Sequence, residues 1–148
     1  MTDVSTSNAT IQVTGDFLGF SPDELFDYWV KPDLLVKWWP REATVDPRMG
    51  GHYSYVWPEQ NWVLQGDFTI FEPGSRLGFT WSWNHDMGKF GKTQVDLTFE
   101  AIDGGTRLNV QHGPWDSSEE AQTERQGVIE GWIHFGMRLA GLGTGEAT

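Results

Sequence analysis

The segment from Ser117 to Leu142 constrains the fold most, because its sequence predicts one long amphipathic helix. Apolar residues recur at helical spacing along one face: Val128, Ile129, Trp132, Ile133, Phe135, Leu139 and Leu142. The opposite side carries polar residues four apart that we expect to face water: Glu130, His134 and Arg138. Ser117 followed by Glu120 predicts a capping box, with Asp116 as an alternative cap. An apolar stripe of this length must be buried, so the helix needs another layer to lie against.

The chain before this helix begins with a predicted strand and two short helices. Residues 9–17 carry apolar side chains at alternate positions, which is typical of a strand. Ser21 and Glu24 form a capping box around Pro22, so a helix begins here. A further proline then starts a second short helix, predicted over residues 32–39.

From residue 42 onward, apolar residues alternate with polar ones, which predicts five or six strands with one buried face. The alternation is clearest in residues 77–83 and recurs in 62–70, 95–99 and 108–112. Residues 53–57 also alternate, but which of their faces points inward is undecided. Glycine and proline turns separate these segments, and Asp103-Gly104-Gly105 predicts a hairpin. The chain is therefore predicted to be an α+β protein, with a curved antiparallel sheet wrapped round the C-terminal helix. A gap is expected wherever the helices do not fill the space inside the sheet.

Composition bounds the class of protein. At 148 residues, the chain suits a single domain over residues 9–148, after a flexible polar tail of residues 1–8. No apolar run approaches the roughly 18 residues of a membrane span, and the start lacks a signal-peptide pattern, so we expect a cytoplasmic protein. The chain has no cysteine, which excludes disulfides and thiolate chemistry. A formal net charge of -11 would repel phosphate backbones and anionic membranes, so neither is an expected partner.

Several short phrases, in order along the chain, resemble one family. They are LLVKWW at 34–39, DPRMGG at 46–51, EPGSRL at 72–77 leading into FTW at 79–81, GTRL at 105–108 and GW at 131–132. Together they resemble the Hsp90 ATPase activator homologue family of the START-like superfamily, also called Bet v 1-like or SRPBCC. The resemblance implies a helix-grip fold with an internal cavity for apolar ligands, and in eukaryotic relatives a co-chaperone role. It carries no catalytic residues across.

The unusual number in the composition is nine tryptophans, beside nine phenylalanines and three tyrosines. Bulky flat rings either fill a core or line a cavity, and both interpretations stay open. A buried indole N–H needs a hydrogen-bond partner, which a cavity mouth supplies through water or ligand. The candidate ligand-binding residues are Trp39, Tyr55, Trp57, Trp62, Trp81, Trp83, Phe99, His112, Trp115, Trp132 and Phe135.

Glycines inside the predicted C-terminal helix are a second signal. Each one costs roughly 1 kcal/mol of helix propensity relative to alanine, and there are four: Gly127, Gly131, Gly136 and Gly141. Either Gly131 and Gly136 let neighbouring strands or indoles approach closely, or they leave volume for a ligand. We favour close packing slightly, because indole rings beside a helix demand space.

The four histidines do not predict a metal or catalytic site. His134 is expected on the wet face of the helix, His112 points inward as a hydrogen-bonded histidine, and the facing of His52 is undecided. His85 and Asp86 are expected to form a solvated pair in a loop. No metal-ligand spacing, phosphate-binding loop or nucleophile elbow occurs, so neither a metal nor a cofactor is predicted.

Three functions remain, in order. The first is binding of a small hydrophobic or aromatic molecule between the sheet and the C-terminal helix. The second, ranked well behind, is an aromatase or cyclase in which His52, His112 or Tyr55 moves a proton inside the cavity. The third is a protein-interaction module of co-chaperone type, which requires an exposed apolar patch. The chain is expected to be a monomer or a homodimer.

Overall fold

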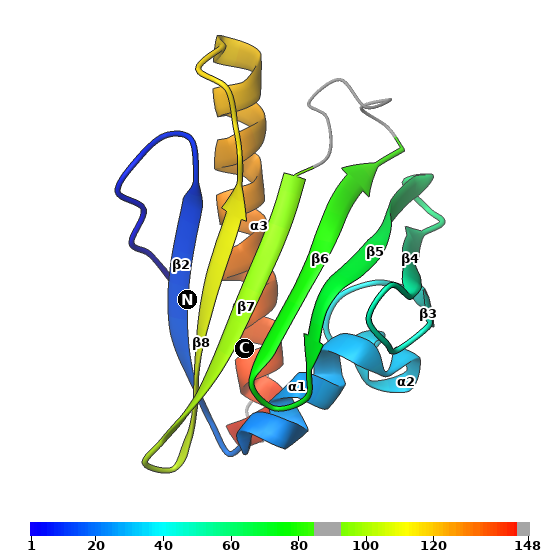
Figure 1. Ribbon diagram of the computed structural model, residues 1–148, viewed down its shortest axis with the longest axis vertical. Helices are drawn as coiled ribbons and strands as arrows, with labels where there is room; N and C mark the ends of the chain where they lie inside the picture. Colours follow the sequence, from blue (N-terminus) through cyan, green and yellow to red (C-terminus); the bar gives the residue numbers. More distant parts are fainter. Residues whose placement is uncertain (85–92, 145–148) are drawn as a thin grey trace.

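The computed structural model describes residues 1–84 and 93–144 of the chain. It confirms the predicted helix-grip architecture: an antiparallel sheet curves round one long C-terminal helix, and two short helices follow the first long strand (Figure 1). The strands are β1 (Thr2–Asp3), β2 (Ile11–Leu18), β3 (Glu42–Val45), β4 (His52–Trp57), β5 (Trp62–Glu72), β6 (Arg76–Trp83), β7 (Thr93–Ile102) and β8 (Gly105–Gly113). The helices are α1 (Pro22–Val30), α2 (Pro32–Leu35) and α3 (Glu119–Thr144).

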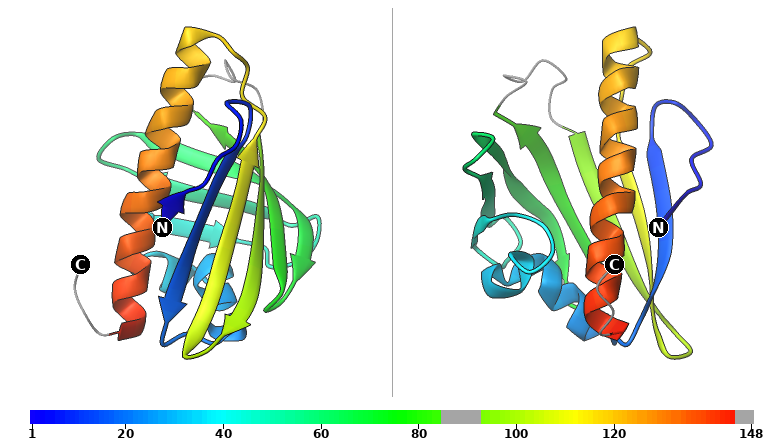
Figure 2. Two further views of the ribbon diagram at one scale, coloured as in Figure 1. Left: turned by 90° about the vertical axis from the view of Figure 1, so that its left-hand side faces the viewer. Right: turned by 180° about the vertical axis from the view of Figure 1, so that it is seen from behind.

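The sheet has the strand order β1-β2-β8-β7-β6-β5-β4-β3. All of its neighbouring strands are antiparallel, as the run of turn signals predicts. Helix α3 lies along one face of this sheet, and α1 and α2 close the same face near the C-terminal end of α3 (Figure 2). In the described residues, no helix has both the length and the apolar character needed to span a bilayer.

Local sequence explains where α1 and α2 begin and end. Both hydrogen bonds of the capping box form at α1, where the Ser21 side chain accepts from Glu24 N and the Glu24 side chain accepts from Ser21 N. Helix α2 is shorter than predicted and ends at Leu35. From Leu35 the chain continues as a tight turn, in which Lys37 N and Trp38 N donate to Leu34 O and Leu35 O at 3.1 and 3.2 Å. This turn directs Trp38 and Trp39 into the interior, where both are buried.

Two predicted details of the C-terminal helix are wrong. The cap is Ser118, whose hydroxyl accepts from Ala121 N at 3.1 Å, so the capping box predicted at Ser117 and Glu120 does not form. Leu142 is 41% exposed, although the predicted stripe includes it. A stripe with heptad spacing drifts by about 20° per heptad on a straight helix, so its last member turns towards solvent.

The N-terminal segment, for which the sequence predicts a tail, lies against β2 and α3. Thr2 and Asp3 form β1, which pairs with β2. The side chain of Met1 packs between Gly15 and Gly136, where the glycines leave room for it. The guanidinium of Arg125 donates to the carbonyls of Ser7 and Thr10 at 2.8 and 3.1 Å.

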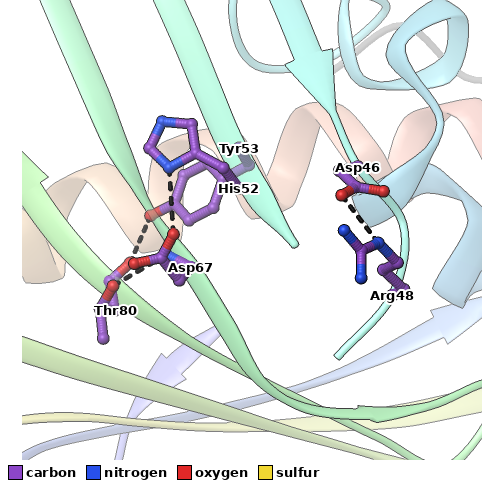
Figure 3. A network of polar contacts seen from close by, with 6 residues as sticks. All are labelled: Asp46, Arg48, His52, Tyr53, Asp67 and Thr80. Carbon is purple, nitrogen blue, oxygen red and sulfur yellow. Dashed lines mark hydrogen bonds and ion pairs between the residues drawn. The ribbon is translucent and has the colours of Figure 1, made fainter. Parts of the chain in front are cut away.

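The core fills the space between the concave face of the sheet and the helices. The structure settles the facing of β4: Tyr53, Tyr55 and Trp57 are buried on the inner face. On the outer face, His52 Nδ1 lies 3.1 Å from Asp67 Oδ1 on β5, with both side chains more than half exposed (Figure 3). These positions match the period-two alternation in the sequence.

Candidate functional site

A pocket of about 460 Å³ opens between α3, the inner face of β4 to β6 and the turn that follows α2. Tryptophan dominates its wall, because seven of the nine tryptophans in the chain line it. The complete lining among the described residues is Trp38, Trp39, Trp57, Gln60, Trp62, Trp81, Trp83, Glu124, Gly127, Val128, Gly131, Trp132 and Phe135. The pocket therefore combines a sheet wall of large rings with a helix wall that contains two glycines.

Three indoles from different elements pack together at the buried side of the pocket. Trp39 follows α2, Trp81 lies on β6 and Trp132 lies on α3. Their ring centroids are 5.6 to 6.0 Å apart in all three pairs, and their planes are tilted by 27 to 41°. Rings at these distances are in favourable aromatic contact, so each indole restrains the other two.

A second group of indoles extends from this cluster towards solvent. Trp83 on β6 stands at 86° to Trp81, 66° to Trp62 and 43° to Trp57, with centroids 5.3 to 6.0 Å away. Trp62 begins β5 and is 42% exposed. The rings are therefore buried at the inner end of the pocket, and the indole of Trp62 at its mouth is exposed.

The helical side of the pocket is open because of Gly127 and Gly131. A Cβ added at either position would meet nothing within 4 Å. Close packing, which we favoured for Gly131 and Gly136, is therefore wrong for Gly131. It is correct for Gly136, where an added Cβ would lie 3.0 Å from Met1 Cγ. Since a side chain at Gly127 or Gly131 would occupy the pocket, both glycines preserve its volume.

His112 lies behind the pocket wall and holds Trp132 in place. It is completely buried, and its Nδ1 accepts from Trp132 Nε1 at 3.3 Å. Its Nε2 therefore carries the proton and donates to Thr93 Oγ1 at 2.7 Å. Burial lowers the pKa of His112 to about 3, so the ring is neutral at physiological pH.

The structure brings together seven of the eleven candidate residues that the sequence singled out. Those that line the pocket are Trp39, Trp57, Trp62, Trp81, Trp83, Trp132 and Phe135. The other four, Tyr55, Phe99, His112 and Trp115, do not belong to the described lining.

Each of the four excluded residues has a packing role. Tyr55 is buried beneath Trp39 and donates its hydroxyl to Trp29 O at 3.2 Å; burial raises its pKa. Phe99 lies six residues after Thr93, the first residue of β7, which corresponds to about 20 Å along the strand. There its ring contacts that of Phe26 on α1. Trp115 packs against His112, with centroids 5.4 Å apart, on the far side of the wall.

Six lining residues were absent from the list of candidate ligand-binding residues, although the helical glycines had raised Gly131 as one that could leave volume for a ligand: Trp38, Gln60, Glu124, Gly127, Val128 and Gly131. Four of them share one signal, because residues 124, 127, 128 and 131 follow one another at helical spacing and continue to Phe135. This strip borders the buried stripe of α3. Trp38 and Gln60 lie in turns, where sequence periodicity does not indicate whether a side chain points towards the pocket or towards solvent.

The remaining histidines do not contribute to the pocket. His52 lies on the outer face of the sheet, and His134 is exposed on α3, as predicted. His85 and Asp86 lie outside the described residues. Since His52, His112 and Tyr55 do not line the pocket in the described part of the chain, the condition set for an aromatase or cyclase is not met. Across residues 1–84 and 93–144, no three potential metal ligands come together.

A curved antiparallel sheet that grips one long helix over an apolar pocket defines the helix-grip class of domains. The family model described as "Activator of Hsp90 ATPase homolog 1-like protein" matches residues 20–143, and the chain belongs to this family. The resemblance seen in the sequence is thereby confirmed. Comparison with curated protein sequences finds no match.

Solved structures with the same fold are distant in sequence. Protein MLL2253 from Mesorhizobium loti is 22% identical with a TM-score of 0.77, covering 90% of this chain and 95% of that one. DynU16, a protein in the dynemicin biosynthetic locus, is 21% identical with a TM-score of 0.75, covering 93% and 48%. The Aha1 dimer from Colwellia psychrerythraea is 16% identical with a TM-score of 0.74, covering 89% and 93%. At these identities the comparisons establish the fold alone.

Proposed function

We propose that this protein binds one small, flat hydrophobic molecule in the tryptophan-lined pocket. The observation that carries the proposal is the pocket of about 460 Å³ beside two helical glycines. Sites for small organic ligands have volumes of about 300 to 1,000 Å³ and mostly apolar walls with few polar groups. The described lining here has only two polar side chains, Gln60 and Glu124.

The shape of the wall favours a planar ligand. Indoles are rigid, and those of Trp39, Trp81 and Trp132 are held by mutual ring contacts and by the His112 hydrogen bond. A preorganised aromatic wall loses little conformational entropy on binding. Flat rings of a ligand can stack or pack edge-on against it, with a gain of about 0.5 to 1.5 kcal/mol for each aromatic pair beyond burial.

The test is a titration with a neutral planar probe, 1-methylnaphthalene, followed by tryptophan fluorescence and by calorimetry. Because seven indoles line the pocket, we expect a saturable 1:1 change in emission. Val128→Phe places a ring in the pocket and is expected to weaken binding about tenfold or more. The matched control is Leu142→Phe, the same ring on the exposed side of α3, which is expected to leave the affinity unchanged.

Two outcomes oppose the proposal. The first is the absence of saturable binding of 1-methylnaphthalene, or of flavone as a larger planar probe. The second is binding that responds equally to Val128→Phe and Leu142→Phe, which places the ligand elsewhere on the protein.

A further inference from the structure

The strip of α3 that borders the pocket is followed directly by a cation. The lining residues of this helix come one after another at helical spacing, and the last of them is Phe135. Arg138 is three residues later, so it lies on the same side of the helix, about one turn further on. Its guanidinium carbon lies over the ring of Phe135, 5.7 Å from the ring centroid. A positive charge therefore lies beside the last ring of the helical wall.

This guanidinium is accessible to a ligand. Arg138 is exposed and Phe135 is half-buried, so the ring of Phe135 borders both the pocket and solvent. Within the described part of the chain, no carboxylate pairs with Arg138, whereas ion pairs hold Arg48 and Arg107. A guanidinium presents a planar fork of N–H donors that matches a carboxylate with two parallel hydrogen bonds. The rim of the pocket at Phe135 thus offers a partner for an acid.

The wall of the pocket also selects against a cationic ligand. Trp81 lines the pocket and is 6% exposed, and its Nε1 has no hydrogen-bond partner among the described residues. An indole N–H is a donor only, so an acceptor satisfies it and a cation does not. Leaving such a donor unpaired costs free energy, which a positive charge nearby would increase. Trp81 and Arg138 therefore both favour a ligand that carries acceptors.

The negative charge of the chain does not outweigh a direct contact with Arg138. The formal net charge of -11 acts mostly at long range, and the Debye length is about 8 Å at physiological ionic strength. The lining carboxylate of Glu124 belongs to the other end of the strip, about 21 Å along the helix from Arg138 at 1.5 Å per residue. An acid bound at Arg138 is therefore about two Debye lengths or more from Glu124, whatever Glu124 itself contacts.

We propose that the ligand of this pocket is a flat aromatic acid, with its rings against the indoles and its carboxylate on Arg138 at the rim. The inference rests on the proposed function, since it names the class of molecule that the same pocket takes. Among the described lining residues there is no lysine or arginine, so the ion pair forms at the rim and the interior stays apolar. Arg138 then orients the ligand, with its polar end at Phe135 and its apolar end among the tryptophans.

The experiment measures the preference for an acid over its neutral amide by calorimetry. The probes are 3-(1-naphthyl)propanoate and 3-(1-naphthyl)propanamide, which share the naphthalene rings and have nearly the same shape. We expect the propanoate to bind about threefold more tightly to the parent protein, because an exposed charge pair changes an affinity by about fivefold at most. Equal affinities, or tighter binding of the propanamide, would overturn the inference.

Arg138→Gln tests whether this guanidinium provides the preference. The ratio of the two affinities should fall about threefold, whereas the affinity for the propanamide should change less than twofold. Arg48→Gln is the matched control, because Arg48 is exposed between β3 and β4 and does not belong to the described lining. It changes the net charge of the chain by the same amount. An equal effect of the two substitutions would mean that only the overall charge acts, which contradicts the inference.

Failure of the inference and failure of the proposed function give different results. In one case the propanamide binds and Val128→Phe weakens its binding, but Arg138→Gln leaves the affinity ratio unchanged. The pocket then binds flat molecules without selecting acids, and the inference alone is refuted. In the other case neither the propanoate nor the propanamide binds, and both proposals are refuted.

Discussion

Replacing Gly131 by leucine should make the protein more stable and unable to bind 1-methylnaphthalene in the pocket. Gly131 is half-buried in α3, and a Cβ there meets nothing within 4 Å. Helix propensity favours leucine over glycine by about 0.8 kcal/mol. Full burial of a leucine side chain contributes about 1.5 to 3 kcal/mol, and the open pocket would deliver roughly half of that. The sum is a stabilisation of about 2 kcal/mol, or about 4 to 8 °C in Tm for a chain of this size.

Gly131→Ala is the matched control for this substitution. Alanine gains the helix propensity, about 1 kcal/mol, but fills little of the pocket. Urea unfolding followed by circular dichroism would give the free energy of unfolding of both variants and the parent. The affinity for 1-methylnaphthalene, measured by calorimetry, should be nearly unchanged in Gly131→Ala and at least tenfold weaker in Gly131→Leu.

The combination of the two measurements is what tests the reasoning. A loss of stability in Gly131→Leu would mean that the space beside Gly131 is already occupied by the protein. Unchanged affinity in a stabilised Gly131→Leu variant would mean that the ligand binds elsewhere. Either result refutes the assignment of this glycine to an open binding pocket.

Two further predictions concern His112 and Gly66. Burial keeps the pKa of His112 at about 3, against 6.5 when unperturbed, so its contribution to stability is complete above pH 6.5 and is lost as the pH falls towards 3. In this window the free energy of unfolding of the parent should fall with decreasing pH more steeply than that of His112→Gln, and the two slopes should differ by about 1.4 kcal/mol per pH unit. Urea unfolding measures both slopes, and equal slopes would contradict a buried neutral ring. Gly66→Ala should cost about 2 kcal/mol or more, because a Cβ there would overlap the Thr80 carbonyl across the β5–β6 ladder, and an unchanged midpoint in urea would show that the strands can separate locally.

The architecture was predictable because local and long-range signals agree. Alternation in the sequence assigns the inner faces of β5 to β8 but not that of β4, and the capping box of Ser21 and Glu24 forms as predicted. The stripe of α3 requires an apolar partner, which a one-sided sheet supplies. The sequence places the cap of α3 at Ser117, one residue before the actual cap Ser118, and it does not predict that Leu142 turns towards solvent. Both depend on where α3 meets and leaves the sheet.

The pocket was predictable only in part. Alternation identifies which residues of a strand face inward, but it does not show which of them lie at the level of the pocket. Tyr55 and Trp57 share the inner face of β4, yet only Trp57 lines the pocket. Tyr55 lies below Trp39, whose position depends on the early end of α2. Phe99 fails for the same reason, since its level on β7 corresponds to α1 instead of the pocket. Depth is a property of how helices cover the sheet, and no local pattern encodes it.

The pocket stays open because its two walls cannot close on each other. An unfilled cavity costs free energy, so side chains normally relax into it. Here the indoles of Trp38 and Trp132 are anchored by hydrogen bonds to Tyr28 O and His112, and ring contacts join them to their neighbours. Across the gap, glycines expose the rigid backbone of α3, which has no side chain to move inward. Two interior glycines cost about 2 kcal/mol of helix propensity, and the binding of a ligand such as the one we propose would offset that cost.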